Sequence, residues 1–440
     1  MNTLRILPLS LLLGAAMSSP LRAQSLVALY ESARGFDASY QSAKAQYDAN
    51  LAKAEQARAL LLPTVNLTGS ASLGIIDNTL KASKQGSYDT QSATIVASQP
   101  LYRPANAASY EQGMKQVDLA KQQLSAADQD LIVRVSVAYF DVLASQDSLA
   151  FVLAQKTAVS EQLASAKRNF EVGTATITDT REAQARFDLV NAQEIAARND
   201  LQIKKIALDQ LVGKTGAEPR PVALPLSLPA LSPDDVNAWV QQSETQHPGI
   251  RQSRVALEVA QLEVQKAQAT LKPTLDLNGS YNLSQNGGSS TADRFFRTNT
   301  ATVSLNFTMP LYSGNAMQNR VKETLLLEDK ARNDLEGTRR TVAQATRTAF
   351  FGVLSGQGQV KALEAAEASS QSALDANKLG YQVGVRINID VLNSQSQLFD
   401  TKARLAKARY DVLVGGLRLR QASGMLKAED LQQVNALLSN

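Results

Sequence analysis

Residues 380–393, GYQVGVRINIDVLN, decide the fold of this chain, because the chain carries a second copy of the same plan. The earlier copy, residues 169–182 with the sequence NFEVGTATITDTRE, lies 211 positions upstream. A Val-Gly pair and an aspartate recur at matching places, with the glycines at Gly173 and Gly384. Glycine accepts the backbone conformation of a tight turn. The two copies therefore predict two similar hairpin-like turns in separate halves of the chain.

The duplication extends over most of the sequence. Residues 62–70, LPTVNLTGS, match residues 272–280, KPTLDLNGS, and the triplet Pro-Leu-Tyr at 100–102 recurs at 310–312. Residues 138–146 likewise match residues 349–357. We therefore divide the chain into a signal peptide at 1–23, a first structural repeat at 24–212, a proline-rich linker at 213–233, a second structural repeat at 234–424 and a C-terminal tail at 425–440.

Each repeat contains two segments in which apolar residues alternate with polar ones. They predict strands at about 64–74 and 92–101 in the first repeat, and at about 274–284 and 299–309 in the second. A strand of about ten residues is long enough to cross a bilayer at a tilt. The same alternation also fits an ordinary half-buried hairpin in a soluble sheet.

The rest of the sequence is typical of helices. Two stretches without strong breakers, 104–170 and 314–380, predict rods about 100 Å long at roughly 1.5 Å rise per residue. Residues 131, 135, 138, 142, 149 and 152 have the spacing of a coiled-coil seam. Shorter helices are predicted at about 26–61, 180–212, 235–271 and 390–424. Placed end to end, the two shorter helices of each repeat have the length of one long rod.

The composition excludes several classes of site. Cysteine is absent and His247 is the single histidine, so we expect no metal centre, no cofactor and no lipid attached through cysteine. A net charge of +4 without a long basic run gives no sign of nucleic-acid binding. His247 reads as a surface residue at a helix start, and Asp235 as a helix cap. Without a convergent titratable cluster, we do not expect an enzyme.

The N-terminus predicts export from the cytoplasm. Arg5 precedes an apolar run at 7–17, and small residues lead to a cleavage site after Ala23. No later window offers about 18 consecutive apolar residues, so we expect no helical membrane anchor and insertion by strands alone. Four strands cannot close a membrane barrel, because the smallest such barrels have about eight and an open edge leaves backbone groups unpaired. Chains must therefore associate, and periodicity alone does not choose between a dimer and a trimer.

With its tandem halves, the Pro-Leu-Tyr triplets and above all the sequence at 380–413, the chain resembles the TolC family of outer-membrane efflux channels. The resemblance implies a membrane β-barrel plus a long α-helical barrel: four transmembrane strands per chain, and a homotrimer with a 12-stranded barrel on a periplasmic coiled-coil tunnel. It also implies a passive exit duct for tripartite efflux or type I secretion in the Gram-negative outer membrane. The partners are then a periplasmic adaptor protein, an inner-membrane transporter and outer-membrane lipid.

A second class fits part of the pattern. A soluble periplasmic coiled-coil adaptor or scaffold protein accounts for the helices and the signal peptide. The alternating strands and the missing lipid anchor weigh against it.

The resemblance assigns roles near the second turn. It places Asp390 and Asn393 at the pore constriction, where the family pattern has aspartate at both positions. We therefore expect one carboxylate ring and a weaker block by cations. Without the resemblance, the favoured interpretation of Asp390 is a helix N-cap or a charge in the first turn of a helix.

The resemblance further implies a gate latch. It pairs Tyr381 and Arg386 with acceptors in the first repeat, Thr178 and Asp179. Arginine and tyrosine suit such bonds as donors, although a solvated surface pair fits the same residues.

The turns themselves resemble the surface on which the adaptor docks. Val172, Gly173 and Thr174 form one predicted tip, and Val383, Gly384 and Val385 the other. Turn formation alone already explains the glycines.

Overall fold

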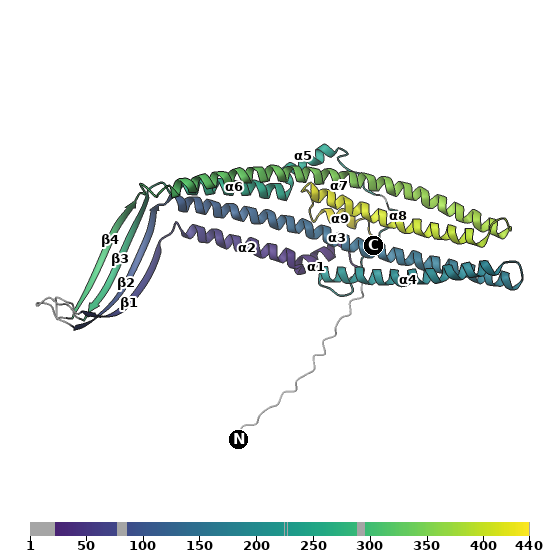
Figure 1. The fold of residues 1–440 in the computed structure, drawn as a ribbon, viewed down its shortest axis with the longest axis horizontal. Coiled ribbons are helices and arrows are strands. Elements are labelled where there is room, and N and C mark those ends of the chain that lie inside the picture. Colours follow the sequence, from purple (N-terminus) through teal and green to yellow (C-terminus); the bar gives the residue numbers. More distant parts are fainter. Residues whose placement is uncertain (1–22, 77–85, 224, 227, 288–294, 440) are drawn as a thin grey trace, which may run out of the picture.

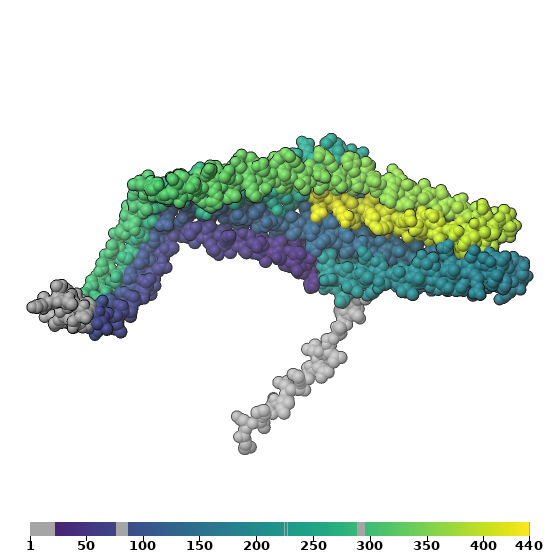
Figure 2. Space-filling model, in the orientation of Figure 1, coloured from purple at the N-terminus to yellow at the C-terminus, as the bar shows by residue number. Residues whose placement is uncertain are grey.

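A computed structural model describes residues 23–76, 86–223, 225–226, 228–287 and 295–439. The predicted signal peptide, except for its last residue, lies outside the described residues, as do parts of the two polar loops between paired strands. The molecule is an elongated helical body with a sheet at one end and two helical turns at the other (Figure 1). The space-filling view shows the same bent, rod-like outline (Figure 2).

Two long helices run the length of the body, and each has two shorter helices stacked beside it (Figure 1). In the first repeat, α3 (Pro104–Glu171) packs against α2 (Ala38–Ala59) and α4 (Ile177–Val212). In the second, α7 (Ala316–Gln382) packs against α6 (Pro248–Ala269) and α8 (Asn388–Ala422). The predicted match between one long rod and two stacked helices is confirmed.

The prediction of one continuous helix at 26–61 is wrong. This segment is divided into α1 (Leu26–Phe36) and α2, with Asp37 between them in an extended conformation. The Asp37 carboxylate accepts a hydrogen bond of 2.8 Å from the Tyr40 amide and so caps α2. The first amides of a helix have no carbonyl partner within that helix, and a capping aspartate accepts a hydrogen bond from one of them.

The predicted helix at 235–271 is also two helices, α5 (Val236–Gln246) and α6. His247 joins them with an extended backbone, because the residue before a proline, here Pro248, is disfavoured in the helical region. Its Nδ1 accepts a hydrogen bond of 3.1 Å from the Gly249 amide. His247 therefore begins a helix as predicted, but it is half-buried rather than on the surface. The Asp235 cap is confirmed by a 3.0 Å bond from the Asn237 amide.

The four strands form one antiparallel sheet in chain order (Figure 1). They are β1 (Thr64–Ile76), β2 (Gly86–Tyr102), β3 (Thr274–Asn286) and β4 (Phe296–Thr308). All four are longer than the ten residues expected, so each is long enough to cross a bilayer. The outer edges of β1 and β4 pair with no strand among the described residues of this chain.

Apolar side chains on the sheet face outward. Leu73 is 87% exposed and Val303 is 79% exposed. A soluble sheet buries such residues against a second layer. The exposure favours a lipid-facing surface over the half-buried hairpin of a soluble protein.

The sheet is fixed to the helical body by one ion pair between the repeats. Arg103, directly before α3, donates through Nε and Nη2 to the two carboxylate oxygens of Asp276 in β3, both at 2.7 Å. Such a bidentate pair constrains direction as well as distance. It joins the start of α3 in the first repeat to β3 in the second.

The largest group of buried residues lies at mid-length, where α1, the linker and the C-terminal tail pack against the long helices. The seam residues Leu131, Val135 and Val142 are fully buried there, as the heptad spacing predicts. The linker and the tail meet through backbone bonds such as Ser439 N to Pro221 O at 2.8 Å. The tail contains a short helix, α9 (Asp430–Asn435).

Of the helices in the described ranges, α3 is the one with a window long and apolar enough to cross a membrane by length and composition. This differs from the expectation that no such helix follows the signal peptide. α3 packs against α2, α4, α6 and α8. Its 68 residues span about 100 Å, roughly three times the thickness of a bilayer core. Its apolar residues therefore serve the coiled-coil seam.

Candidate gate at the coil tips

The two coil pairs, α3–α4 and α7–α8, end in turns of the same geometry (Figure 1). Gly173 has φ +76° and Gly384 has φ +77°. The Thr174 amide donates to the Asn169 carbonyl at 2.8 Å, and the Val385 amide donates to the Gly380 carbonyl at 2.8 Å. Positive φ is strained for residues with a Cβ, so glycine fits both turns. The predicted duplication of this turn is confirmed.

The helices after the two turns begin differently. At the start of α4, the Thr176 hydroxyl accepts from the Asp179 amide at 3.2 Å, and the Asp179 carboxylate accepts from the Thr176 amide at 2.9 Å. This reciprocal pair is a capping box. The α8 N-cap, Ile387, has no side chain that can cap. Asp390 is the third residue of α8, as Asp179 is of α4, but it forms no capping box.

Arg386 supplies the partner of Asp390. The guanidinium Nη1 lies 3.8 Å from Asp390 Oδ2, and both side chains are partly exposed. An exposed pair of this kind contributes less than about 1 kcal/mol. Gly380 lies beneath it, and a Cβ there would stand 2.6 Å from Arg386 Cγ. The glycine therefore makes room for the arginine.

The predicted latch pairing is not formed within the protomer. In the ranges that the structure describes, no hydrogen bond or ion pair joins Tyr381 or Arg386 to the side chain of Thr178 or Asp179. The physical reason is competition, because the capping box occupies Asp179 and Asp390 lies nearer to Arg386. The Tyr381 hydroxyl instead accepts a hydrogen bond of 3.3 Å from Asn169 Nδ2.

Asn388 is a functional candidate that the sequence analysis missed. Its side chain is fully buried where α8 begins. The Asn388 Oδ1 accepts from Gln162 Nε2 of α3, and the Asn388 Nδ2 donates to the Asp179 carbonyl of α4 at 3.4 Å. One side chain therefore joins the start of α8 to both helices of the first coil pair. The available signal was a polar residue at the place that Ile177 has in the first copy.

Arg186 is the second residue that was missed. Its Nη2 donates to Asn393 Oδ1 at 2.8 Å, from α4 to α8. The asparagine at the second predicted constriction position is thus neutral and bonded to a cation. The sequence pattern offered no indication of this contact, because 207 residues separate the two positions.

The tips expose apolar side chains. Val172, Val383 and Val385 are each at least 65% exposed, and Ile387 is exposed beside them. A Cβ on Gly384 would meet no atom within 4 Å. Clustered exposed apolar residues at the end of a rod are typical of a contact surface.

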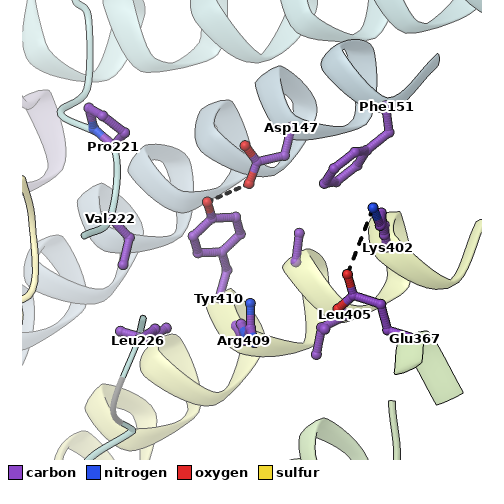
Figure 3. A pocket seen from close by; sticks show the side chains of 11 residues that line it. Asp147, Phe151, Pro221, Val222, Leu226, Glu367, Lys402, Leu405, Arg409 and Tyr410 are labelled. Carbon is purple, nitrogen blue, oxygen red and sulfur yellow. Dashed lines mark hydrogen bonds and ion pairs between the residues drawn. The ribbon is translucent and has the colours of Figure 1, made fainter. Parts of the chain in front are cut away.

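At mid-length, a cavity of about 360 Å³ lies between α3, α8 and the linker (Figure 3). The Tyr410 hydroxyl donates to Asp147 Oδ2 at 2.6 Å, linking the second coil pair to the first. Burial raises the pKa of the Asp147 carboxyl, and the bond from Tyr410 partly offsets this. Pro221 and Val222 of the linker cover the cavity from one side. The cavity belongs to the joint between the repeats.

The described part of the chain has no group of three His, Asp or Glu side chains placed to hold a metal ion. The arrangement at the tips can hold two coil pairs together and present charge.

Comparisons with known proteins agree with this arrangement. A family model described as outer membrane efflux protein matches residues 29–214 and 239–425. Outer membrane protein TolC of Vibrio cholerae is 33% identical over 435 residues, which cover 98% of this chain and 98% of that protein. Alkaline protease secretion protein AprF of Pseudomonas aeruginosa is 30% identical over 407 residues, 91% of this chain and 84% of that protein. The solved structure of outer membrane protein VceC from Vibrio cholerae matches with a TM-score of 0.77 at 19% identity, covering 91% and 96% of the two chains.

The fold is that of a tandem-repeat outer-membrane channel protein, with a strand domain and a long helical domain. The chain belongs to the outer membrane efflux protein family. The predicted family, fold class and outer-membrane location are confirmed. The alternative of a soluble periplasmic adaptor or scaffold is not supported by these relatives.

Proposed function

We propose that this protein is a passive exit duct of the outer membrane, which serves tripartite efflux or type I secretion as a homotrimer. The observation that carries the proposal is a four-stranded sheet with two open edges and exposed apolar side chains, at the end of a helical body about 100 Å long. Open edges in lipid are costly, so copies must pair β1 with β4. Three copies give a 12-stranded barrel whose helices continue below it.

The narrowest point of the duct lies at the tips. Asp390 and Asn393 are three residues apart on α8 and share a face of that helix. A ring of Asp390 carboxylates favours cations. The ring of Asn393 adds no negative charge, and Arg186 holds it. We therefore propose a constriction with weaker cation preference than two carboxylate rings give.

Four residues of the tips act in gating. Tyr381 and Arg386 of the second coil pair, and Thr178 and Asp179 at the start of α4, all lie within about one turn of the tips. Within a protomer Tyr381 bonds to Asn169 and Arg386 to Asp390. In the trimer these donors hold the coils inward, and the coils separate when partners bind.

The adaptor docks on the exposed tips, and an inner-membrane transporter completes the assembly. Val172, Gly173, Thr174 and the residues 383–385 form the docking surface. Their apolar exposure suits packing against helical hairpins.

Two measurements test the proposal. The purified protein is expected to migrate as a heat-modifiable trimer and to form channels in planar bilayers, and a deletion strain is expected to become drug-sensitive or to lose a secreted protein. A protein that is monomeric and forms no channels contradicts the proposed duct. The double variant Arg386→Ser, Tyr381→Phe is expected to raise single-channel conductance several-fold, and unchanged conductance contradicts the gating role of those two residues.

A further inference from the structure

A stripe of amide side chains runs along the face of α3 that meets the second coil pair. Gln155, Gln162 and Asn169 follow one another at intervals of seven residues, so they lie on one face of the helix. Gln155 is buried and the other two are half-buried. We call these three residues the amide stripe.

Each member of the amide stripe bonds to α7 or α8. Gln155 Nε2 donates to Ser396 Oγ at 3.3 Å, and Asn169 Nδ2 donates to the Tyr381 hydroxyl at 3.3 Å. Between them, Gln162 Nε2 donates to Asn388 Oδ1. The buried Asn388 also reaches the Asp179 carbonyl. The stripe and Asn388 therefore form a row of separate bonds between the coil pairs.

Apolar residues fill the spaces between the amides. Val159, Leu163 and Ala166 of α3 pack in one cluster with Leu392 of α8. Apolar contacts can re-form after two helices slide, but a buried amide without its partner loses the full benefit of its bond. The amides therefore specify one register, as single polar residues do in coiled coils.

The bonds between the coil pairs carry almost no charge. No ion pair joins α3 or α4 to α7 or α8 in the residues that the structure describes. The Arg386–Asp390 pair lies within the second coil pair, and the Thr176–Asp179 box within the first. Two bonds between the coil pairs have one charged partner: Arg186 donates to the neutral Asn393 side chain, and the Asp147 carboxyl accepts from the neutral Tyr410 hydroxyl at mid-length. Salt screens interactions between exposed charges and has little effect on buried neutral bonds.

We infer that the amide stripe, with Asn388 as its central partner, is the catch that keeps the second coil pair against the first in the closed duct. Within each protomer, the contact between the two coil pairs then depends on neutral hydrogen bonds and changes little with ionic strength. The inference rests on the proposed function, because it concerns the gate of that duct.

Single-channel recording of the full-length trimer tests the catch. Asn388→Ala and Gln162→Ala each remove the central bond, and each is expected to raise the ratio of open to closed channels on the order of 10-fold. The double variant is expected to open no further than the stronger single variant, because both changes remove the same bond. If Asn388→Ala fails to form trimers on a gel, Gln162→Ala carries the test.

Asn377→Ala is the matched control. Asn377 Nδ2 donates to Ser394 Oγ at 2.6 Å, a bond of the same kind but within the second coil pair. Its loss is expected to leave the conductance unchanged. Equal gains in Asn377→Ala and Asn388→Ala overturn the catch.

A salt series separates this catch from a charged latch. Between about 0.1 and 1 M KCl, the wild-type conductance is expected to follow the conductivity of the electrolyte. A steeper rise with salt overturns the neutral catch. A wild type that forms no channel contradicts the proposed duct itself, whereas a conducting wild type with an unaffected Asn388→Ala contradicts the catch alone.

Discussion

The turn at Gly173 and the turn at Gly384 share one backbone conformation and differ in the helix that each one starts. The first leads into a capping box, with Ile177 49% exposed. The second leads into an uncapped helix, with Asn388 at the same place and 0% exposed. The duplicated glycine preserves the shape of the tip. The residues that differ direct the second turn toward the first coil pair.

The difference between the two turns lowers the local stability of the second helix, because that helix has no side-chain cap. A side-chain cap contributes about 1 kcal/mol to a helix, and α8 lacks one. In its place, Asp390 pairs with Arg386 and Asn388 bonds to its neighbours in the first coil pair. The first turn is built for local stability, and the second for contact with the rest of the gate.

The largest expected effect comes from charge at the second tip. Gly384→Arg is expected to leave trimers intact and to abolish export, because a bulky cation at the exposed tip prevents the adaptor from docking. Drug sensitivity and secretion by cells carrying the variant measure the loss.

The control for this variant separates the effect of the bulky charge from the effect of adding a Cβ at a positive φ. Gly384 has φ +77°, a conformation that asparagine tolerates better than other residues with a Cβ. Gly384→Asn is therefore expected to keep most of the export. Normal export by Gly384→Arg contradicts the docking role, and Gly173→Arg shows whether the two tips contribute equally.

A smaller effect is expected at the constriction. Asn393→Asp adds a second carboxylate ring, so the concentration of a multivalent cation that blocks the channel is expected to fall on the order of 10-fold. Titration of the conductance with the cation measures it. Glu182, the counterpart of Asn393 in the first repeat, gives the control Glu182→Gln, which is expected to leave the block unchanged. A block that responds to Glu182 and not to Asn393 reverses the assignment.

The smallest effect is expected at mid-length, where Asp147 has a glycine, Gly358, as its counterpart. Burial raises the folded-state pKa of Asp147 above the unfolded value. The folded state therefore binds the proton more tightly, and this contribution to stability is present at low pH and lost as pH rises through the folded pKa. Asp147→Asn is expected to raise the thermal midpoint slightly at pH 7. The difference is expected to vanish at a pH below the unfolded pKa, and thermal unfolding at the two pH values checks it.

Much of the fold was accessible from the sequence. Heptad spacing located the buried seam at Leu131 and Val135, and alternation located all four strands. The break at Asp37 was missed, because a long helical pattern hides a single extended residue. His247 was predicted to start a helix, but the predicted helix at 235–271 ran through it although Pro248 marks the break. Strands β2 and β3 were placed short, because polar residues at 86–91 and 285–286 end the alternation before the pairing ends.

The gate was accessible only in part. Repetition located the two tips, but it gave no sign that the Arg386 guanidinium lies 3.8 Å from the Asp390 carboxylate within the protomer. It also provided no sign of Arg186 or of the buried state of Asn388.

The sequence by itself determined the duplicated plan, because periodicity and glycine placement act over a few neighbouring residues. Only the tertiary structure decided which polar groups meet across the two repeats. Those contacts join residues more than 200 positions apart, such as Gln162 and Asn388. Which partner each side chain takes depends on distance and on competing bonds, and both are set by packing.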